Sequence, residues 1–311
     1  MIEQEIVIHS AGITLSGTLC LPDAEGCFPV VFMVHGSGCL DRDENAKGFQ
    51  LNVFNTFAHH LSEAGIASLR YDKRGCGRSA GDYHTAGHHD LVDDTIACYD
   101  ALTRHESCIK NQVYVLGHSE GTVIAPQMTL KRPAIAGIIL LNPFVQKLEP
   151  ILIQQARHIA DAINGQGGIK GLLLRLAAKL VGDPVRIQRR LIQKLKTTDK
   201  PTIRRGFNKL PVKWFREAMA LDPETIFGSV TTPMLVVGGE KDLQCDPADV
   251  ARIAALAKGP VETHVIKDLT HILRLDPQPP SILNYRKLLK MPIAPEVLNR
   301  VTEWLSSRIA G

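Results

Sequence analysis

The chain has 311 residues, of which 44% are hydrophobic and 22% are charged, and it contains 25 Gly and 18 Pro. These values are close to the averages of globular proteins, so they exclude a disordered, collagen-like or low-complexity protein. The net charge of +4 conceals a local excess, because residues 170–216 carry +12, from 14 Lys or Arg against two Asp, and the remaining chain carries −8.

Short apolar runs alternate with helical patterns over the first part of the chain. Two β-branched runs flank Ala11-Gly12, which indicates a hairpin. Further strands are predicted at residues 30–34, 66–71, 112–116 and 135–141, and helices at residues 49–64, 88–105 and 121–130. Apolar strands that alternate with helices are typical of a mostly parallel sheet with helices on both faces. The predicted fold class is therefore α/β.

The alternation stops between residues 144 and 228. This stretch shows helical periodicity and contains no strand candidate. Ile187, Leu191 and Leu195, for example, recur at the four-residue spacing of one helix face. We interpret the stretch as a helical cap inserted into the α/β core.

The sheet pattern resumes after the insertion. Strands are predicted at residues 234–238 and 261–266, separated by a helix near residues 247–257. Pro295 at a first helical position opens a last helix that extends to about residue 309. We therefore predict that residues 1–143 and 229–311 form the α/β core and residues 144–228 the cap.

Cysteine spacing and the lengths of the apolar runs bear on where the protein resides. The seven cysteines are odd in number and form no Cys-x-x-Cys pair, which argues against a disulfide framework or a zinc ribbon, so we expect reduced thiols. The longest apolar runs, residues 30–34 and 135–141, are far shorter than the ~20 residues of a membrane-spanning helix. The acidic start at residues 1–5 does not resemble a secretory signal. These observations predict a cytoplasmic protein without a stable membrane anchor.

The segment Gly117-His118-Ser119-Glu120-Gly121 lies where the strand at 112–116 ends and the next helix begins. In such a turn the serine is held in a strained conformation, and the glycines let strand and helix approach closely enough to expose its hydroxyl. Open α/β sheets bind ligands at the carboxyl ends of their strands. Ser119 is therefore a candidate nucleophile.

A serine nucleophile needs a base, and the base needs a carboxylate to orient it. The strand at 234–238 is followed by Asp242, and the strand at 261–266 is followed by His271. The order Ser119, Asp242, His271 is that of α/β hydrolases rather than of chymotrypsin or subtilisin. We therefore predict a catalytic triad of these three residues.

Other residues compete for two of these roles. His264 is an alternative base, but a side chain within a strand points sideways from the sheet rather than off its end. Asp246 and Asp249 are alternative acids, but they lie beside Pro247, where a helix begins, and fit capping positions better.

An acyl-transfer site also needs donors for the oxyanion that develops on the substrate. The segment His35-Gly36-Ser37-Gly38 follows the strand at 30–34, and we assign the donors to the backbone N–H groups of Ser37 and Glu120. A free carboxylate on Glu120 would disfavour the oxyanion. We therefore predict that this side chain turns away and pairs with Lys73 or Arg74.

These motifs together give the chain a resemblance to a known family. It resembles bacterial serine esterases of the α/β-hydrolase fold in which His-Gly-Ser-Gly, here residues 35–38, precedes an Asp-Arg-Asp loop, here residues 41–43. Residues 69–79 and 117–121 fit the same pattern. The resemblance, which covers about residues 28–145 and 232–275, implies hydrolysis of carboxylic esters through an acyl-enzyme. One departure is Asp268, where the family usually has a glycine three residues before the catalytic histidine.

Several polar residues near these motifs are assigned structural roles. We expect His35 and His118 to pack beside the site rather than to act as bases. Asp72, Arg74 and Arg78 lie in a glycine-rich loop and are expected to form a buried Asp–Arg clamp. The carboxylates of the 41–43 loop lack a clustered histidine, so we predict no metal, and we predict no cofactor.

The leading hypothesis is a serine carboxylesterase acting on small-molecule esters with short-to-medium acyl groups. The acyl pocket is predicted to be built by Leu172, Leu173, Leu174, Leu176 and Leu180 together with neighbouring apolar residues of the cap. The same machinery could instead serve an acyl-CoA thioesterase or a peptidase-like amidase. A catalytically silent binding module is the alternative outside enzymes.

The basic segment 170–216 has two interpretations. In the first, its Lys and Arg form the solvated faces of lid helices; in the second, they form an electropositive mouth for acidic substrates or anionic lipid. Nucleic acid is not expected, because the segment has few aromatic residues and no recognised binding motif. The sequence does not predict the oligomeric state.

Overall fold

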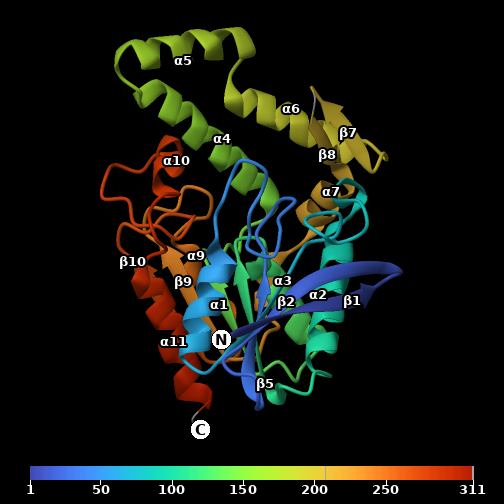
Figure 1. Cartoon of the computed structure of the whole chain (residues 1–311). Coiled ribbons are helices and arrows are strands. Elements are labelled where there is room, and N and C mark those ends of the chain that lie inside the picture. Colours follow the sequence, from blue (N-terminus) through green and yellow to red (C-terminus); the bar gives the residue numbers. More distant parts are fainter. Residues whose placement is uncertain (207, 310–311) are drawn as a thin grey trace.

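The computed structural model describes residues 1–206 and 208–309. Eight strands form one sheet in the order β1-β2-β4-β3-β5-β6-β9-β10 (Figure 1). Its strands are β1 (Ile2–Ser10), β2 (Ile13–Leu21), β3 (Phe28–Val34), β4 (Ala67–Tyr71), β5 (Cys108–His118), β6 (Gly137–Leu141), β9 (Met234–Gly239) and β10 (Val261–Ile266). The pairs β1–β2 and β2–β4 are antiparallel and the other neighbours are parallel, so the predicted mostly parallel sheet is confirmed.

Helices cover both faces of this sheet, as predicted. They are α1 (Val53–Glu63), α2 (His88–Leu102), α3 (Gly121–Lys131), α4 (Leu148–Gly165), α5 (Gly168–Val181), α6 (Pro184–Thr197), α7 (Val212–Ala220), α8 (Pro223–Phe227), α9 (Asp249–Leu256), α10 (Tyr285–Leu288) and α11 (Pro295–Ile309), with short 3-10 turns η1 (Tyr83–Thr85) and η2 (Ile282–Asn284). None of the described helices has both the length and the apolar character that crossing a lipid bilayer requires.

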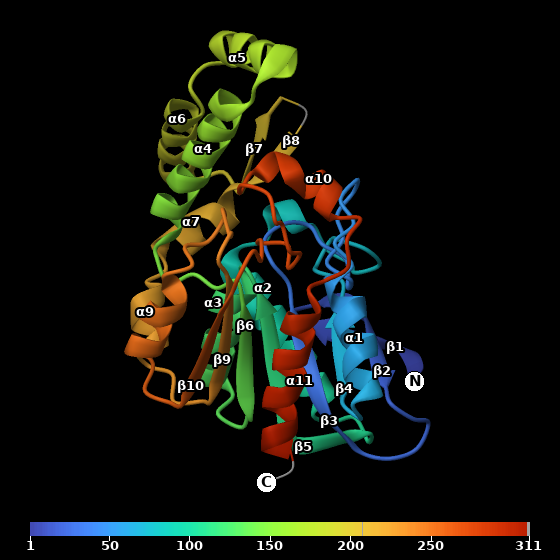
Figure 2. The ribbon, with the colours of Figure 1, turned by 90° about the vertical axis from the view of Figure 1, so that its left-hand side faces the viewer.

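Side chains of the central strands alternate between two hydrophobic cores. In β3, Phe32 points to the core shared with α2, α3, α8 and α9, whereas Met33 points to the core shared with α1, α10 and α11. Figure 2 shows α1 and α11 together on one side of the sheet. Every residue of β6 and of β9 is buried, as expected of strands covered on both faces.

The N-terminal hairpin is confirmed. Ala11 and Gly12 have φ of 45° and 81°, and positive φ at both central residues is the geometry of a type I′ turn. The turn pairs β1 with β2 along their full length.

The chain between β6 and β9 contains the predicted helices, α4 to α8, but also strands that we did not predict. β7 (Thr202–Arg205) and β8 (Asn208–Pro211) form a two-stranded antiparallel sheet, so the prediction of no strand between residues 144 and 228 is wrong. Each of these strands has four residues and one large aliphatic side chain, Ile203 or Leu210, which is too few to produce visible alternation. Figure 1 shows α4, α5 and α6 beyond one end of the main sheet.

Candidate active site

Ser119 lies in a sharp turn between β5 and α3. Its φ is 52°, in the left-handed region, which a non-glycine residue adopts only at a cost in conformational energy. A Cβ on Gly117 would collide with the carbonyl of Gly121, and one on Gly121 would collide with the carbonyl of Val34. The two glycines therefore permit the close approach of strand and helix that holds the serine hydroxyl outward, as the motif predicts.

The three residues predicted to form the triad lie in one chain of hydrogen bonds. Ser119 Oγ lies 3.0 Å from His271 Nε2, and His271 Nδ1 lies 2.7 Å from Asp242 Oδ2. The other carboxylate oxygen accepts the backbone N–H groups of Gln244 and Cys245, at 2.7 and 2.9 Å. Since a carboxylate only accepts, Nδ1 carries the proton and Nε2 is left to accept from the serine hydroxyl. This geometry is suited to general-base activation of Ser119.

The competing residues are occupied elsewhere. His264 lies within β10 and contacts Glu262 at 2.9 Å on the surface. Asp246 accepts a backbone N–H just before α9, and Asp249 in the first turn of α9 pairs with Arg252 at 2.7 Å. None of the three makes a hydrogen bond to Ser119 or His271 among the residues that the structure describes.

The departure at Asp268 falls on a backbone conformation that favours glycine. Asp268 has φ of 60°, a conformation that glycine adopts freely and that aspartate tolerates better than most residues. Its carboxylate pairs with Lys241 at 2.6 Å. The aspartate therefore adopts the left-handed conformation that favours a glycine, three residues before His271.

The two predicted oxyanion donors border Ser119. Gly36 lies so close to Ser119 that a Cβ added to it would contact the serine Cβ. Within the described part of the chain, neither the N–H of Ser37 nor that of Glu120 has a hydrogen-bond partner. Both residues line the cavity that contains Ser119, so both N–H groups are free to donate to a ligand oxygen there.

The side chain of Glu120 turns away from the serine, as predicted. Its carboxylate contacts Lys73 Nζ at 3.0 Å and accepts the indole N–H of Trp214 from α7. Burial alone would raise the pKa of Glu120, but the positive charge of Lys73, with a contribution from His88, lowers this pKa to about 2. Lys73 also donates to the carbonyl of Gly36 at 2.6 Å. The pair therefore connects the turn at Ser119 and helix α7 to residues 35–38, which we call the oxyanion loop after its predicted role.

A second buried ion pair, which we did not predict, connects the oxyanion loop to the loop that carries His271, which we call the histidine loop. Glu44, fully buried, accepts the N–H of Gly36 at 2.6 Å and lies 2.9 Å from His118 Nδ1. His118 Nε2 lies 3.0 Å from the carbonyl oxygen of His271. Burial would lower the pKa of His118, but the charge of Glu44 raises it. In the sequence, the feature that pointed to Glu44 as a site residue was its position directly after the Asp-Arg-Asp motif at residues 41–43.

Asn142 completes the connections between the loops. It follows β6 with φ of 50°, and its side-chain amide donates to the carbonyl of His271 at 2.9 Å and to that of Thr270 at 3.1 Å. Its amide oxygen accepts the N–H of Gly239 at 2.8 Å. A polar residue at the carboxyl end of an apolar strand was the signal in the sequence. Asn142 therefore joins the loop of the acid to the loop of the base.

The predicted clamp at Asp72 exists, but with a different partner. Asp72 pairs with Arg42 at 2.9 Å and accepts the backbone N–H of Arg78. Arg74 instead pairs with Asp94 at 2.6 Å, and the Arg78 side chain is exposed. The prediction that Arg74 or Arg78 clamps Asp72 is wrong, because Arg42 reaches Asp72 from a loop distant in sequence.

His35 packs as predicted. It is fully buried between Phe54 and Tyr71, with ring centroids 5.2 and 4.7 Å away. Burial lowers its pKa to about 4, so the ring is neutral at physiological pH.

The carboxylates of the 41–43 loop are engaged within the protein. Asp41 accepts backbone N–H groups of its own turn, and Asp43 pairs with Arg70 at 2.7 Å. Among the described residues, one group has donor atoms close enough for a metal ion, namely Asp242, Cys245 and His271. Two of these already form the hydrogen-bonded chain to Ser119, so the absence of a metal and of a cofactor stays a prediction.

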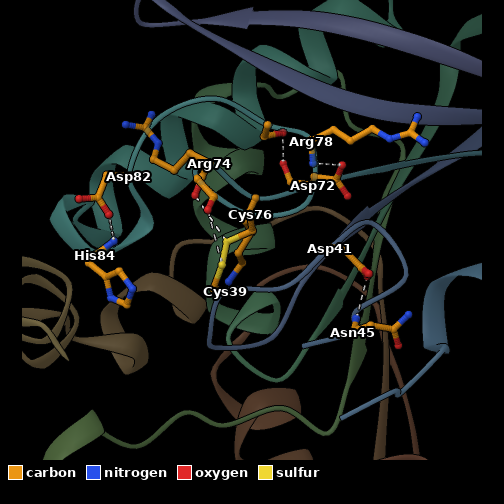
Figure 3. The surroundings of a disulfide bond; sticks show 12 residues. Cys39, Asp41, Asn45, Asp72, Arg74, Cys76, Arg78, Asp82 and His84 are labelled. Atoms are coloured by element: carbon orange, nitrogen blue, oxygen red, sulfur yellow. Dashed lines mark hydrogen bonds between the residues drawn. A yellow bond between two sulfur atoms is a disulfide. The ribbon is translucent and has the colours of Figure 1, made fainter. Parts of the chain in front are cut away.

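Cys39 and Cys76 form a disulfide, so the prediction of reduced thiols is wrong for this pair (Figure 3). The two residues are 37 positions apart, but their Cα atoms lie 5.5 Å from each other. Cys39 follows the oxyanion loop directly, and Cys76 lies in the loop after β4. Such a pairing joins two loops that only the tertiary fold brings together, which is why spacing did not indicate it.

A cavity of about 690 Å³ opens above Ser119 and His271. Its walls are mainly apolar and come from Leu148, Ile151 and Leu152 of α4, Leu210 of β8, and Trp214 and Phe215 of α7. The predicted acyl pocket is wrong for Leu172, Leu173, Leu174, Leu176 and Leu180, none of which is among the described residues that line the cavity, whereas other apolar residues of the stretch 144–228 do line it. All five belong to α5, whereas the walls come from α4, β8 and α7.

Comparisons with known proteins agree with this architecture. Esterase EstD of Thermotoga maritima is 26% identical over 305 residues, which are 97% of this chain and 67% of the Thermotoga protein. Est1E of Butyrivibrio proteoclasticus, solved with ferulic acid bound, has a TM-score of 0.65 at 20% identity, over 98% of this chain and all of that one. The α/β hydrolase GrgF of Penicillium sp. sh18 has a TM-score of 0.64 at 17% identity, over the full length of both chains.

The predicted α/β-hydrolase fold is thereby confirmed. A family model described as serine aminopeptidase, S33 matches residues 47–278, which is more than half of the chain. The protein belongs to the serine aminopeptidase S33 family.

Proposed function

We propose that the protein is a carboxylic-ester hydrolase in which Ser119 is the nucleophile, His271 the general base and Asp242 the residue that orients the base. The observation that carries this proposal is the continuous contact from Ser119 Oγ to His271 Nε2 and from His271 Nδ1 to Asp242, at 3.0 and 2.7 Å, beside an apolar cavity. The similarity to an esterase of Thermotoga maritima supports an ester as the bond that is cleaved.

Acylation begins when Ser119 Oγ attacks the ester carbonyl carbon and its proton passes to His271 Nε2. Asp242 stabilises the imidazolium through Nδ1. The bond to the leaving oxygen then breaks, the alcohol takes the proton from Nε2, and the acyl group stays on Ser119. A water molecule repeats the sequence and releases the acid.

The N–H groups of Ser37 and Glu120 are proposed to hold the oxyanion in both steps. Each such donor typically contributes about 2.7–4 kcal/mol of transition-state stabilisation. The pairing of the Glu120 carboxylate with Lys73 supports this role, because it keeps the negative charge of the side chain neutralised.

We also propose that residues 144–228 act as a cap on a core formed by residues 1–143 and 229–311. Cavity walls from α4, β8 and α7 support this division. The hydrogen bond that the indole N–H of Trp214 in α7 donates to the Glu120 carboxylate connects the proposed cap to the residue after the proposed nucleophile.

The buried part of the substrate is proposed to be uncharged. Charged groups along the cavity already have partners: Glu44 pairs with His118, Glu120 with Lys73, and Lys209 with Asp82 at 2.8 Å. If the protein attracted an anionic substrate electrostatically, the association rate would fall as the Debye length decreases from about 30 Å at 0.01 M salt to about 8 Å at 0.15 M. We expect kcat/KM to stay nearly constant over that range.

The family description favours one alternative, a peptidase-like amidase. An aminopeptidase needs a free carboxylate for the substrate ammonium group, but Glu44 and Glu120, the acidic residues among the described cavity lining, are both paired. Turnover of p-nitrophenyl esters, aminoacyl p-nitroanilides and acyl-CoA, compared on one enzyme preparation, separates esterase, amidase and thioesterase.

The direct test is Ser119→Ala. We expect loss of p-nitrophenyl ester turnover by about 10⁴-fold or more and loss of labelling by a fluorophosphonate. Ser229→Ala, which removes a surface hydroxyl bonded to Thr225, is the matched control and should behave like the wild type. Retained turnover in Ser119→Ala, or no labelling of the wild type, would reject the proposed mechanism.

A further inference from the structure

Helix α5 presents an apolar face that no other described residue covers. Its members are Ile169, Leu172, Leu173, Leu176 and Leu180, with exposed fractions of 79%, 54%, 61%, 49% and 90%. They follow the spacing i, i+3, i+4, i+7 and i+11, which is one face of a helix. The opposite side, with Leu174 and Ala178, is half-buried, and α5 packs against α4. Contiguous aliphatic surface of this kind marks an interaction site in a soluble protein.

The face of α5 lies away from the proposed active site. Both views show α5 at the far end of the arm formed by α4, α5 and α6, remote from the sheet (Figures 1 and 2). The described cavity lining includes residues of α4 and α7 but none of α5. Binding of substrate therefore does not account for the exposed side chains.

The surroundings of this face are strongly basic. Residues 168–200 contain nine Lys or Arg and two Asp. Lys179 on α5 and Arg186, Arg189 and Arg190 on α6 are exposed, and no carboxylate of the described residues lies within ion-pair distance of any of them. The partner of this surface must therefore combine an apolar phase with negative charge.

We propose that the apolar face of α5 docks reversibly on an anionic phospholipid surface. Helices with aliphatic residues on one side and Lys or Arg around them lie in the membrane interface, and anionic head groups attract the basic residues. The aliphatic side chains enter the boundary of the acyl chains, and the arginines of α6 contact the head groups.

The same observations disfavour two other partners. A second copy of the chain would bring two α5 helices together, but the α5 sequence contains Lys170, Arg175 and Lys179 and no acidic residue, so no complementary charges would flank the contact. Nucleic acid would satisfy the arginines, but its phosphate backbone offers no apolar surface for five aliphatic side chains.

The test is co-sedimentation of the full-length protein with vesicles of phosphatidylcholine alone and of phosphatidylcholine mixed with phosphatidylglycerol in equal parts. We expect binding to the mixed vesicles that weakens as salt rises. Leu172→Gln/Leu180→Gln should lower the partition coefficient by about tenfold or more, because two aliphatic side chains no longer enter the interface. Arg186→Gln/Arg189→Gln/Arg190→Gln should lower it by a similar factor and reduce its salt dependence.

The matched control is Leu130→Gln/Met291→Gln. It removes two exposed apolar side chains from the surface outside residues 144–228 and should leave vesicle binding unchanged. Turnover of a soluble p-nitrophenyl ester and circular dichroism should be the same in all variants, which shows that each one folds. The proposal is overturned if the wild type does not bind the mixed vesicles at low salt, or if Leu172→Gln/Leu180→Gln binds them equally well. Sedimentation velocity tests a third outcome that would overturn the proposal: the wild type is a dimer, Leu172→Gln/Leu180→Gln is a monomer, and neither protein binds vesicles.

Discussion

Charged and apolar groups have opposite environments in two regions of the molecule, the carboxyl end of the sheet and the arm formed by α4, α5 and α6. Around Ser119, the carboxylates of Glu44, Glu120 and Asp242 are buried, and each has a charged or hydrogen-bonding partner within the chain. On α5, aliphatic side chains face solvent and the neighbouring arginines lack ion-pair partners among the described residues. The first region is complete in itself and rigidly connected, whereas the second is suited to a surface outside the protein.

Glu120→Gln tests the first half of this comparison most strongly. The substitution leaves the ammonium of Lys73, which is 1% exposed, without its counter-charge. We expect a loss of about 3–5 kcal/mol in the free energy of unfolding, measured by chemical denaturation. Glu149→Gln removes the partner of Lys196 on the surface of the arm and should cost about 0.5 kcal/mol or less. Equal effects of the two substitutions would remove the contrast between the regions.

The disulfide provides a second test of rigidity around the oxyanion loop. Cys39→Ser/Cys76→Ser opens a loop of 37 residues, and the chain-entropy argument gives a loss of about 4 kcal/mol. Thermal unfolding of this variant, and of the wild type with and without a reductant, measures the effect. Cys27→Ser, at an exposed free cysteine, is the control and should change little. A wild type whose melting is insensitive to reductant would show that the bond adds nothing to stability.

Glu44→Gln tests the link between the oxyanion and histidine loops. Glutamine has the same shape but removes the charge that raises the pKa of His118, and displaced loops misalign the reacting groups. We expect kcat/KM on a p-nitrophenyl ester to fall about 100-fold. Glu262→Gln, at an exposed Glu–His pair on β10, should leave turnover unchanged.

The pH dependence of stability shows whether Glu44 stabilises the fold through its ion pair with His118 or only through packing. The raised pKa of His118 means that its contribution is complete below the unfolded value of about 6.5 and is lost as pH rises through the folded value. The lowered pKa of Glu44 means that its contribution is present above about 4.3 and is lost as pH falls through the folded value. The stability difference between the wild type and Glu44→Gln should therefore be largest between about pH 5 and pH 6.5. A difference that does not vary with pH would argue for packing alone.

The two regions also differ in how far the sequence predicted them. The sheet, the turn at Ser119 and the positions of Asp242 and His271 are encoded locally, because each follows a strand whose apolar run is visible by itself. The contacts of Glu44, Asn142 and Asp72 could not be predicted in this way, since they join loops that only the tertiary fold brings together. Sequence patterns place a residue at the end of a strand but do not state which neighbouring loop it binds.

The arm was predicted correctly as helical and incorrectly in its contacts. We predicted that the leucines of α5 would form the acyl pocket beside Ser119, because apolar faces of helices usually pack inward. The structure gives that role to α4 and α7 and leaves α5 outside. Periodicity reports the existence of an apolar face but carries no information about what lies against it.

The smallest expected effect comes from Leu173→Gln on the exposed face of α5. Leu173 is 61% exposed, so its removal from the isolated protein should change the free energy of unfolding by about 0.5 kcal/mol or less. Leu195→Ala, at a fully buried position of α6 in the same arm, should cost about 2–5 kcal/mol because it leaves a cavity. Denaturation of both variants in solution measures the two values. If Leu173→Gln were as destabilising as Leu195→Ala, the α5 face would already be packed against protein in solution, and the arm would no longer differ from the sheet in having a surface without a partner.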